Sequence, residues 1–399
     1  MGLGADVRRA YKFRMRPTAR QHMALTACVE SHRELYNAAL QERRDAWAYS
    51  KTRIRYRDQA AQLTDVRMAF PDTAVWSYSS QQATLRRLNK AFDAFFRRVK
   101  TGRTPGYPRF KGRHRFDSVE WPKDGDGARW HPDTNSVYLQ GIGSVKATAH
   151  RAVQGRVKTI QIRREGRRWF LILSCDEVPE HPLPATGRQA GIDLGVASFA
   201  TTSDGRHFEN PRWGRLAAEK LATAQQRLAR AKRGSKNRGR CRATVAARHR
   251  KIASCRRDFH HKAARELVGT YDLLVVEDLA IANMLRRAKP VADLDNPGAF
   301  LPNGARAKSG LSRSISDAGW GQFISILRAK AEDAGRTWTE VDPRHTSDRC
   351  ENCGHAASEN RVTQAEFVCQ ACGHTAHADE HAARNILRVG LARHAADAA

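Results

Sequence analysis

Residues 349–387 read RCENCGHAASENRVTQAEFVCQACGHTAHADEHAARNIL, and this stretch decides how the C-terminal half folds. Two CxxC pairs stand in it with fifteen residues between them, Cys350 with Cys353 and Cys369 with Cys372. Each pair makes a short turn that presents two thiolates to one side, and a glycine follows each pair. This spacing predicts a zinc ribbon in which four thiolates close a tetrahedral shell, so the zinc would be structural and not catalytic.

The other cysteines and the nearby histidines lack such spacing. Four thiolates leave no vacancy for a further ligand, so we interpret the neighbouring histidines as surface or phosphate-facing side chains, the alternative being that one is a ligand: His355, His374 and His377. The remaining cysteines are scattered along the chain: Cys28, Cys175, Cys241 and Cys255. Nothing at the N-terminus resembles a secretion signal, so a reducing compartment favours a metal site over disulfides.

Length and composition bound the class of protein. The chain has 399 residues, of which 41% are hydrophobic, enough for two or three globular domains. No apolar run is long enough to cross a membrane, and we expect a cytoplasmic protein. Lysine and arginine number 70 against 41 acidic residues, a formal net charge of +29. This surplus predicts a polyanionic partner, above all nucleic acid; the alternative, a generally basic surface as in some ribosomal proteins, also means RNA.

In the N-terminal half the spacing of hydrophobic residues changes twice along the chain, first from a strand pattern to a helical one and then back. Residues 11–16 predict a strand, and Thr18 with Gln21 resembles a capping box that opens a helix. The pattern stays helical to about residue 100. After a basic stretch rich in glycine and proline the period falls to two, which predicts strands and a hairpin. We therefore expect a β-rich body with a helical insertion.

The C-terminal half begins after a proline-rich linker, EVPEHPLPATGRQ. GIDLGVASFATTSDGRHFE predicts a strand, an SDG turn and a second strand, and YDLLVVEDL predicts a buried strand. Residues 212–262 are helical and carry 17 lysines and arginines against Glu219 and Asp258, with RGSKNRGR as the tip of a helical hairpin. We expect a mobile loop at 285–315, then a helix in WGQFISILRAKAEDAG and a short strand in TWTEVD.

Three carboxylates stand where these strands end and the last helix begins. Asp193 lies in GIDLG, Glu277 ends LLVVE, and Asp379 opens the run DEHAARNIL. Each has an ordinary explanation, such as an N-cap for Asp379 or a strand-end charge for Glu277. Together, three acids from two strands and a helix can converge on two divalent ions that activate a water for phosphodiester cleavage, and oxygen ligands suit Mg²⁺. Such an arrangement of acids and ions is typical of an RNase H-like nuclease.

GIDLG, VVEDL and the D-x-x-A-A-x-N run of Asp379, Ala382, Ala383 and Asn385 resemble the three RuvC motifs of the TnpB family. TnpB proteins are transposon-encoded, RNA-guided DNA nucleases and are regarded as ancestors of type V CRISPR effectors. SRSISDAGWGQF, TSDRCENCG and the N-terminal YKFRMRPTARQ are similar to the same family. The resemblance therefore covers nearly the whole chain.

The resemblance implies an α+β multidomain fold. It implies an N-terminal wedge-like β-barrel (1–17 and 118–182) with a helical recognition insertion (18–117), then a RuvC-like nuclease (183–345 and 376–399) that contains the zinc ribbon (346–375). It makes Asp193, Glu277 and Asp379 the catalytic acids and the ligands of two Mg²⁺ ions. The structural zinc would be held by the four ribbon thiolates: Cys350, Cys353, Cys369 and Cys372.

The resemblance also implies partners. These are a guide RNA, from a transposon end or a CRISPR locus, and double-stranded target DNA recognised beside a short adjacent motif. A monomer is favoured, and no membrane is involved. Residues 212–262 would neutralise phosphates of the RNA or of an RNA–DNA duplex, the alternative being a solvated basic helix pair. Candidates for facing DNA, since glutamine and arginine can read bases in the major groove, are Gln81, Gln82, Arg86 and Arg87, the alternative for each being a solvated surface side chain. Candidates for stacking on bases, unless they pack in the core, are Trp76, Tyr78 and Tyr107.

The chain departs from the family pattern beside the last acid. Family members often have Asp-Arg-Asp-x-Asn where this chain has His377-Ala378-Asp379-Glu380-His381. Asp379 keeps its spacing to the Ala-Ala pair, so we keep it as catalytic, whereas the role of the acid that His377 replaces is in doubt. TSDRC stands in place of the commoner TSQTC. Two arginines are minor candidates for stabilising phosphate charge: Arg344 and Arg349.

Several function classes compete with the transposon-encoded nuclease. A miniature type V CRISPR effector would share the whole architecture. A nuclease-inactive, RNA-guided DNA-binding regulator should have lost at least one acid, and all three are present. A transposase that joins DNA strands also uses an acidic RNase H-like site but would act without RNA. A zinc-ribbon RNA-binding factor would leave the three acids unexplained.

Overall fold

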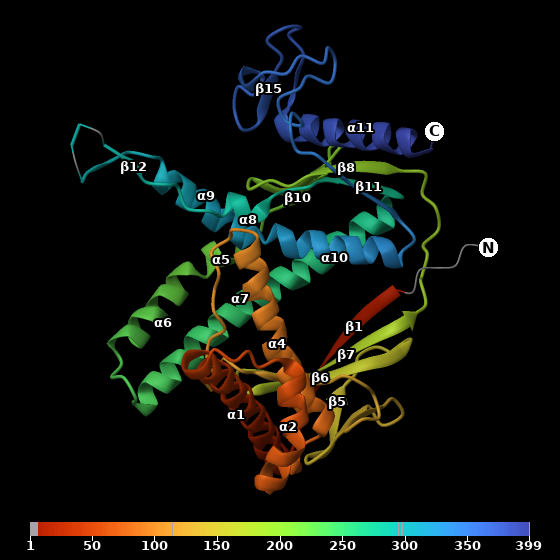
Figure 1. The fold of residues 1–399 in the computed structure, drawn as a ribbon. Helices are drawn as coiled ribbons and strands as arrows, with labels where there is room; N and C mark the ends of the chain where they lie inside the picture. Colours follow the sequence, from red (N-terminus) through yellow and green to blue (C-terminus); the bar gives the residue numbers. More distant parts are fainter. Residues whose placement is uncertain (1–6, 114, 294, 297, 399) are drawn as a thin grey trace. The chain divides into compact units, whose positions relative to one another are not determined.

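The computed structural model describes residues 7–113, 115–293, 295–296 and 298–398, and the chain divides into two compact units, up to Pro179 and from Glu180 (Figure 1). Each unit has a sheet of its own with helices packed against it. The α+β class expected from the sequence is confirmed. No helix among these residues is long and apolar enough to cross a membrane.

The sheet of the first unit has seven strands in the order β2-β6-β7-β1-β5-β4-β3, all paired antiparallel. They are β1 (Val7–Met15), β2 (Ser118–Trp121), β3 (Ala128–His131), β4 (Ser136–Leu139), β5 (Gly143–Thr148), β6 (Arg156–Glu165) and β7 (Arg168–Val178). Alternate residues of β1 are buried, Tyr11, Phe13 and Met15, because successive side chains of a strand point to opposite faces. The wedge-like β-barrel stays a prediction.

Helices fill the segment between β1 and β2: α1 (Ala19–Ser50), α2 (Tyr56–Ala69), α3 (Pro71–Ala74) and α4 (Tyr78–Lys100). The predicted capping box opens α1, since Gln21 N–H donates to Thr18 Oγ1 at 3.2 Å and Thr18 N–H donates to Gln21 Oε1 at 3.0 Å. Leu88 of α4 is fully buried in the same core as the strands. Of the stacking candidates, Trp76 is buried, whereas Tyr78 and Tyr107 are exposed.

Two side chains proposed to face DNA have structural roles in α4. Gln81 is buried, and its side-chain oxygen accepts a hydrogen bond from Arg67 Nη1. Arg87 donates to the Ser118 carbonyl at 3.2 Å, which ties the helix to β2. The expectation that Gln81 reads bases is therefore wrong, because its polar atoms are used inside the fold, whereas Arg86 remains exposed.

The sheet of the second unit has five strands in the order β10-β9-β8-β11-β14. They are β8 (Gln189–Asp193), β9 (Ser198–Thr202), β10 (His207–Glu209), β11 (Leu273–Glu277) and β14 (Thr337–Val341). The strands β8, β11 and β14 are parallel to one another, while β9 and β10 pair antiparallel. The sequence predicts two strands at 191–209, whereas the structure has three, because β8 ends at Asp193 before the hairpin of β9 and β10 begins.

Both faces of this sheet are covered by helices, so the central strand β11 is apolar up to Glu277. Leu274 and Val276 of β11 face a core shared with α7 (Lys236–Thr270) and α10 (Trp320–Asp333). Leu273 and Val275 face the opposite side, where α11 (Ala378–Ala398) packs. The run LLVVE reads as a buried strand for this reason.

The remaining elements of the second unit are short or lie outside the sheet. They are α5 (Trp213–Leu216), α6 (Ala218–Arg230), α8 (Ile281–Met284), β12 (Val291–Ala292), β13 (Phe300–Leu301), α9 (Ala305–Ala318), a 3₁₀ turn η1 (Ser358–Asn360), β15 (Glu366–Val368) and β16 (Thr375–His377). The mobile loop expected at 285–315 is wrong in its last part. Helix α9 begins at Ala305 and buries Ile315 and Ala318 against the core, which the polar composition of its first turns did not reveal.

Candidate nuclease site with an adjoining zinc ribbon

The three acids meet at the carboxyl edge of the second sheet. In the parallel pair β8 and β11, Ile192 stands opposite Val276, so the next residues of both strands, Asp193 and Glu277, emerge side by side. Asp379 lies in the first turn of α11, which packs on β8. The strands and the helix therefore bring together the side chains that the sequence analysis singled out from three distant segments.

Burial and the neighbouring carboxylates raise the pKa of Asp193. Burial contributes most, the negative charges of Glu277 and Asp379 add to it, Arg361 opposes it, and the net result is a pKa of about 7. Burial also raises the pKa of Glu277, opposed by the hydroxyl of Thr346, which lies 2.5 Å from Glu277 Oε1. Crowded, partly desolvated carboxylates of this kind are stabilised by a bound cation.

Arg361 reaches this site from the loop between the two cysteine pairs, and its role was not predicted from the sequence. Its Nη2 lies 3.2 Å from Asp379 Oδ1. Of the two arginines considered from the sequence, Arg344 is exposed and pairs with Asp342, and Arg349 is also exposed. No motif marks Arg361, since its proximity to the acids arises only from the folding of the ribbon back onto α11.

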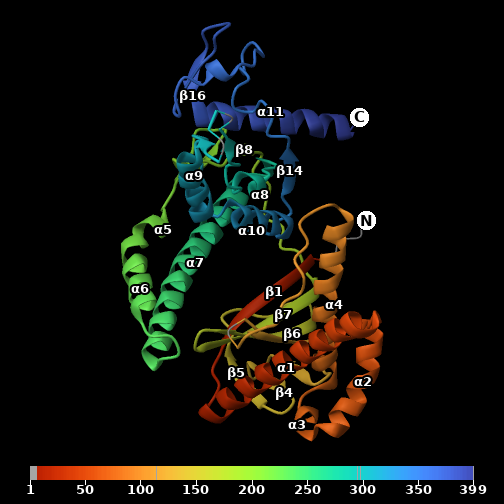
Figure 2. The same cartoon turned by 60° about the vertical axis from the view of Figure 1, so that its left-hand side comes forward.

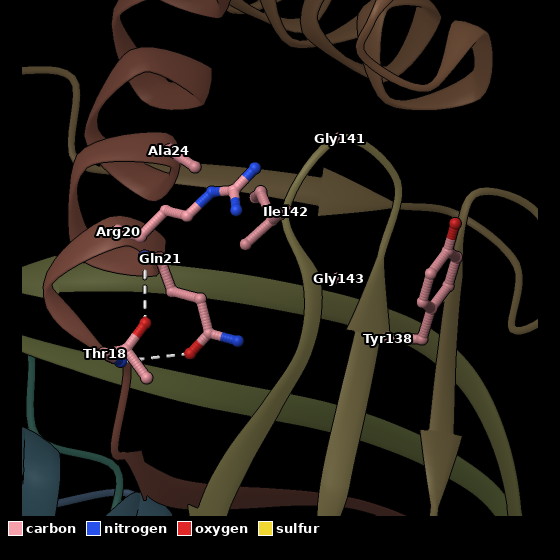
Figure 3. A pocket seen from close by; sticks show the side chains of 8 residues that line it. All are labelled: Thr18, Arg20, Gln21, Ala24, Tyr138, Gly141, Ile142 and Gly143. Atoms are coloured by element: carbon pink, nitrogen blue, oxygen red, sulfur yellow. Dashed lines mark hydrogen bonds between the residues drawn. The ribbon is translucent and has the colours of Figure 1, made fainter.

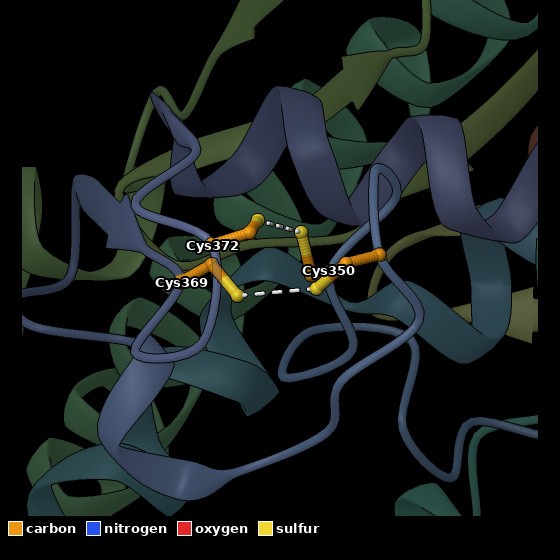
Figure 4. A group of neighbouring side chains, drawn as sticks. Cys350, Cys369 and Cys372 are labelled. Atoms are coloured by element: carbon orange, nitrogen blue, oxygen red, sulfur yellow. Dashed lines mark hydrogen bonds between the residues drawn. The ribbon is translucent and has the colours of Figure 1, made fainter.

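The four ribbon cysteines gather as their spacing predicted (Figure 4). Cys350 Sγ lies 3.7 Å from Cys372 Sγ, and Cys353 Sγ lies 3.5 Å from Cys369 Sγ. Sulfurs bound about 2.3 Å from one tetrahedral zinc ion would lie about 3.8 Å apart, whereas a disulfide would bring them to about 2.05 Å. The cluster fits a zinc ion. The glycines after each pair have φ of +76° and +72°, the left-handed conformation that lets each turn close.

The ribbon is fastened to α11, the helix that carries Asp379. Asn385 of the third motif donates to the carbonyls of Thr346 at 3.0 Å and Arg349 at 2.7 Å. His381 stacks on Phe367 of β15, with ring centroids 3.7 Å apart. Thr346 in turn contacts Glu277, so the ribbon, the last helix and the second acid form one connected network.

Two family models match the parts of the chain that contain the three acids and the ribbon. Residues 173–288 match the family OrfB_IS605, described as "Probable transposase", and residues 320–386 match "Cas12f1-like, TNB domain". The chain is 32% identical over 385 residues to "Putative RNA-guided DNA endonuclease InsQ" of Escherichia coli (strain K12), covering 96% of this chain and 92% of that protein. The chain belongs to the OrfB_IS605 (TnpB) family.

Other relatives agree with this assignment to the TnpB family. The chain is 32% identical over 394 residues to a "Putative RNA-guided DNA endonuclease" of Streptomyces pristinaespiralis, covering 97% of this chain and 90% of that protein. The structure is similar in fold to Cas12f1 from a cryo-EM complex with sgRNA and target DNA, with a TM-score of 0.56, 14% identity, and coverage of 96% of this chain and 98% of that one. Residues 1–52 match a family model described as "Helix-turn-helix domain". Within residues 7–50, however, the structure has the strand β1 followed by one continuous helix, α1.

The basic hairpin of this TnpB-family chain is formed by α6 and α7, which lie side by side in both views (Figure 2). Between them lies a hollow of about 320 Å³ whose cationic side chains come from both helices: Lys220, Arg227, Arg240 and Arg248. Within the part of the chain that the structure describes, none of these four makes an ion pair. Cationic side chains from two neighbouring helices suit contact with a nucleic-acid backbone.

The first unit has a larger hollow, of about 490 Å³, where the start of α1 faces the turn between β4 and β5 (Figure 3). Thr18 and Gln21 line it and are hydrogen-bonded to each other in the capping box. Arg20 and Tyr138 line it from the two sides with exposed polar atoms. The hollow offers one cation and one aromatic ring, the types of group that contact a phosphate and a base.

Proposed function

We propose that this chain is an RNA-guided, Mg²⁺-dependent DNA endonuclease that is encoded by a transposon and acts in the cytoplasm. The observation that carries the proposal is the meeting of Asp193, Glu277 and Asp379 at the edge of the second sheet. The order of its strands, three antiparallel and then two further parallel ones, supports a RuvC-like, RNase H-like nuclease core. Full-length relatives that bear the name RNA-guided DNA endonuclease support the same reading.

The acids are proposed to hold the catalytic ions. They come from two strand ends and the first turn of a helix, and carboxylates that converge in this way can hold a pair of ions. When bound, two Mg²⁺ ions would supply an activated water and stabilise the leaving oxygen of the phosphodiester. The backbone pairing of β8 and β11 fixes the separation of the first two acids, and α11 adds the third.

The surrounding residues orient and balance these acids. Thr346 holds one oxygen of Glu277, which leaves the other for a cation. Arg361 places its guanidinium beside Asp379, where it can also face a phosphate of the scissile strand. The zinc ribbon (346–375) is proposed to keep Arg361 and Thr346 in place, and the RuvC-like core would comprise 183–345 and 376–399.

The basic hairpin and the first unit are proposed to bind the nucleic acids. The unpaired cations on α6 and α7 would neutralise phosphates of a guide RNA or of its duplex with DNA. Base pairing would then select the target, while the first unit, with its proposed wedge-like barrel and helical insertion at 18–117, would contact the short adjacent motif.

The proposal separates cleavage from binding, and Asp193→Ala tests this. Loss of one carboxylate removes the ions and not the basic surface, so guided cleavage should disappear while binding of guide and target persists in a gel-shift assay. Asp72→Ala, an exposed carboxylate on α3, is the matched control and should cleave normally. Cleavage by Asp193→Ala, or loss of its binding, would contradict this division of roles.

A miniature type V CRISPR effector is the second candidate. The match of residues 320–386 to a Cas12f1-like TNB domain and the fold similarity to Cas12f1 favour it. Both candidates use the same site and the same chemistry, so the origin of the bound RNA distinguishes them.

A further inference from the structure

A second group of metal-ligating side chains lies beside the acids. His207, His377 and Glu380 each offer one ligand atom, and these three atoms lie within 4.8 Å of one another. They come from three elements: His207 starts β10, His377 ends β16, and Glu380 stands in the first turn of α11. We propose that these residues form a binding site for one divalent transition-metal ion, and Zn²⁺ is the ion that we expect to bind.

The spacing of the ligand atoms fits such an ion. His207 Nε2 lies 3.2 Å from Glu380 Oε1, and the rings of His207 and His377 have centroids 5.1 Å apart. Nitrogen and oxygen ligands about 2.0–2.1 Å from a tetrahedral zinc ion lie about 3.3 Å apart. The first pair already has this separation, and a small rotation of the exposed His377 ring would bring in the third ligand.

The surroundings of His207 orient its ring for metal binding. Its Nδ1 lies 3.2 Å from Ser198 Oγ and 3.2 Å from Thr201 Oγ1, and either oxygen can accept a hydrogen bond from Nδ1–H. The Nε2 lone pair is then directed at the Glu380 carboxylate, an arrangement that needs a proton or a cation between the two. Metal-bound histidines are held in this way, with the second ring nitrogen bonded to a neighbouring polar group.

The ligand types select a different ion from the one proposed for the acids. Imidazole nitrogens suit zinc and other transition ions, whereas carboxylates alone suit Mg²⁺. The site is also separate from the ribbon, whose four thiolates lie in another group. Three protein ligands leave one coordination position open, and the part exposure of His207 and Glu380 gives an ion access.

An ion here would join β10 to the first turn of α11, next to Asp379. The site explains why a histidine at 377, where the TnpB pattern often has an acid, is compatible with the fold. It needs no nuclease activity to exist, so its test is independent of the proposed function.

Metal binding by the full chain tests the site. Protein whose ribbon is loaded with zinc is titrated with Zn²⁺ by calorimetry in excess Mg²⁺, so that the carboxylate site is occupied. The wild type should bind one further equivalent, and that equivalent should be lost in His207→Ala and in Glu380→Gln. His249→Ala, which removes an exposed histidine of α7, should keep it, as should Asp193→Ala.

A more conservative variant tests whether misfolding, and not loss of a ligand, causes the loss of the further zinc equivalent. Ser198→Ala removes one of the two hydroxyls that orient His207. It should lower the affinity for the further zinc equivalent by at most about 10–100-fold without abolishing binding. Circular dichroism melts should be unchanged for all variants in the absence of added zinc. A wild type that binds no zinc beyond the ribbon, or a His207→Ala variant that binds the same amount, would overturn the proposal.

Discussion

Gly191→Ala should damage the site without touching any of the three acids. Gly191 lies in β8 where α11 crosses it, and a Cβ there would stand 2.1 Å from the Ala383 carbonyl oxygen and 2.5 Å from the Leu387 nitrogen. Carbon and oxygen make contact at about 3.3 Å, so α11 must withdraw by about 1 Å. Both obstructing atoms are backbone, and rotation of a side chain cannot relieve the overlap.

The displacement has two calculable consequences. Overpacking of a well-packed interface costs about 1–3 kcal/mol of the free energy of unfolding. Because Asp379 is carried by α11, it would also shift by about 1 Å from Asp193 and Glu277, and a misplacement of that size can lower a catalytic rate about 10²-fold. The cleavage rate should therefore fall much further than the fraction of folded protein.

The assay compares two glycine-to-alanine variants of the same unit. Single-turnover cleavage with saturating guide and target gives the rate, and urea unfolding gives the stability. Gly269→Ala is the control: this glycine is exposed in helix α7 with nothing within 4 Å of the new Cβ, and alanine there should stabilise by about 0.5–1 kcal/mol. Wild-type cleavage and stability in Gly191→Ala would refute the packing of α11 on β8 described above.

Three further predictions concern other parts of the chain. Cys350→Ser should lower the zinc content measured by atomic absorption and make the ribbon sensitive to protease; unchanged zinc would mean that the ligand set is wrong. Arg227→Ala should weaken binding of RNA and reduce the slope of log affinity against log salt by about one, and an unchanged slope would remove the hairpin from the interface. Burial lowers the pKa of His32 to about 4, below its ordinary value of about 6.5, so its neutral form stabilises the first unit above pH 6.5 and this stability is lost as the pH falls towards 4. Urea unfolding should show about 2 kcal/mol lost between pH 7 and pH 5, and His32→Gln should remove that part of the pH dependence.

Features encoded by local pattern could be predicted from the sequence. The strands that end at Asp193 and Glu277 are marked by continuous apolar runs, because helices cover both faces of the sheet. The cysteine cluster follows from the spacing of its two pairs, since each turn sets the direction of two thiolates. The capping box at Thr18 needs only three residues of sequence.

Features that depend on tertiary contacts could not be predicted. Arg361 approaches Asp379 only after the ribbon has folded onto α11. His207 and Glu380 are separated by more than 170 positions, and only the pairing of β10 with β9 brings the first to the second. Gln81 looked like a base-reading residue because its polarity is visible in the sequence, whereas its hydrogen bond with Arg67 inside the fold is not.

The RNA that co-purifies with the protein expressed from its native locus tests the central claim most directly, and sequencing it is the measurement to make. A guided nuclease should yield one discrete RNA with a constant part and a variable end of about 20 nucleotides. The constant part would identify a transposon end or a CRISPR repeat. Random cellular RNA alone would mean that the charge of +29 binds RNA without specificity, and it would contradict the RNA-guided account.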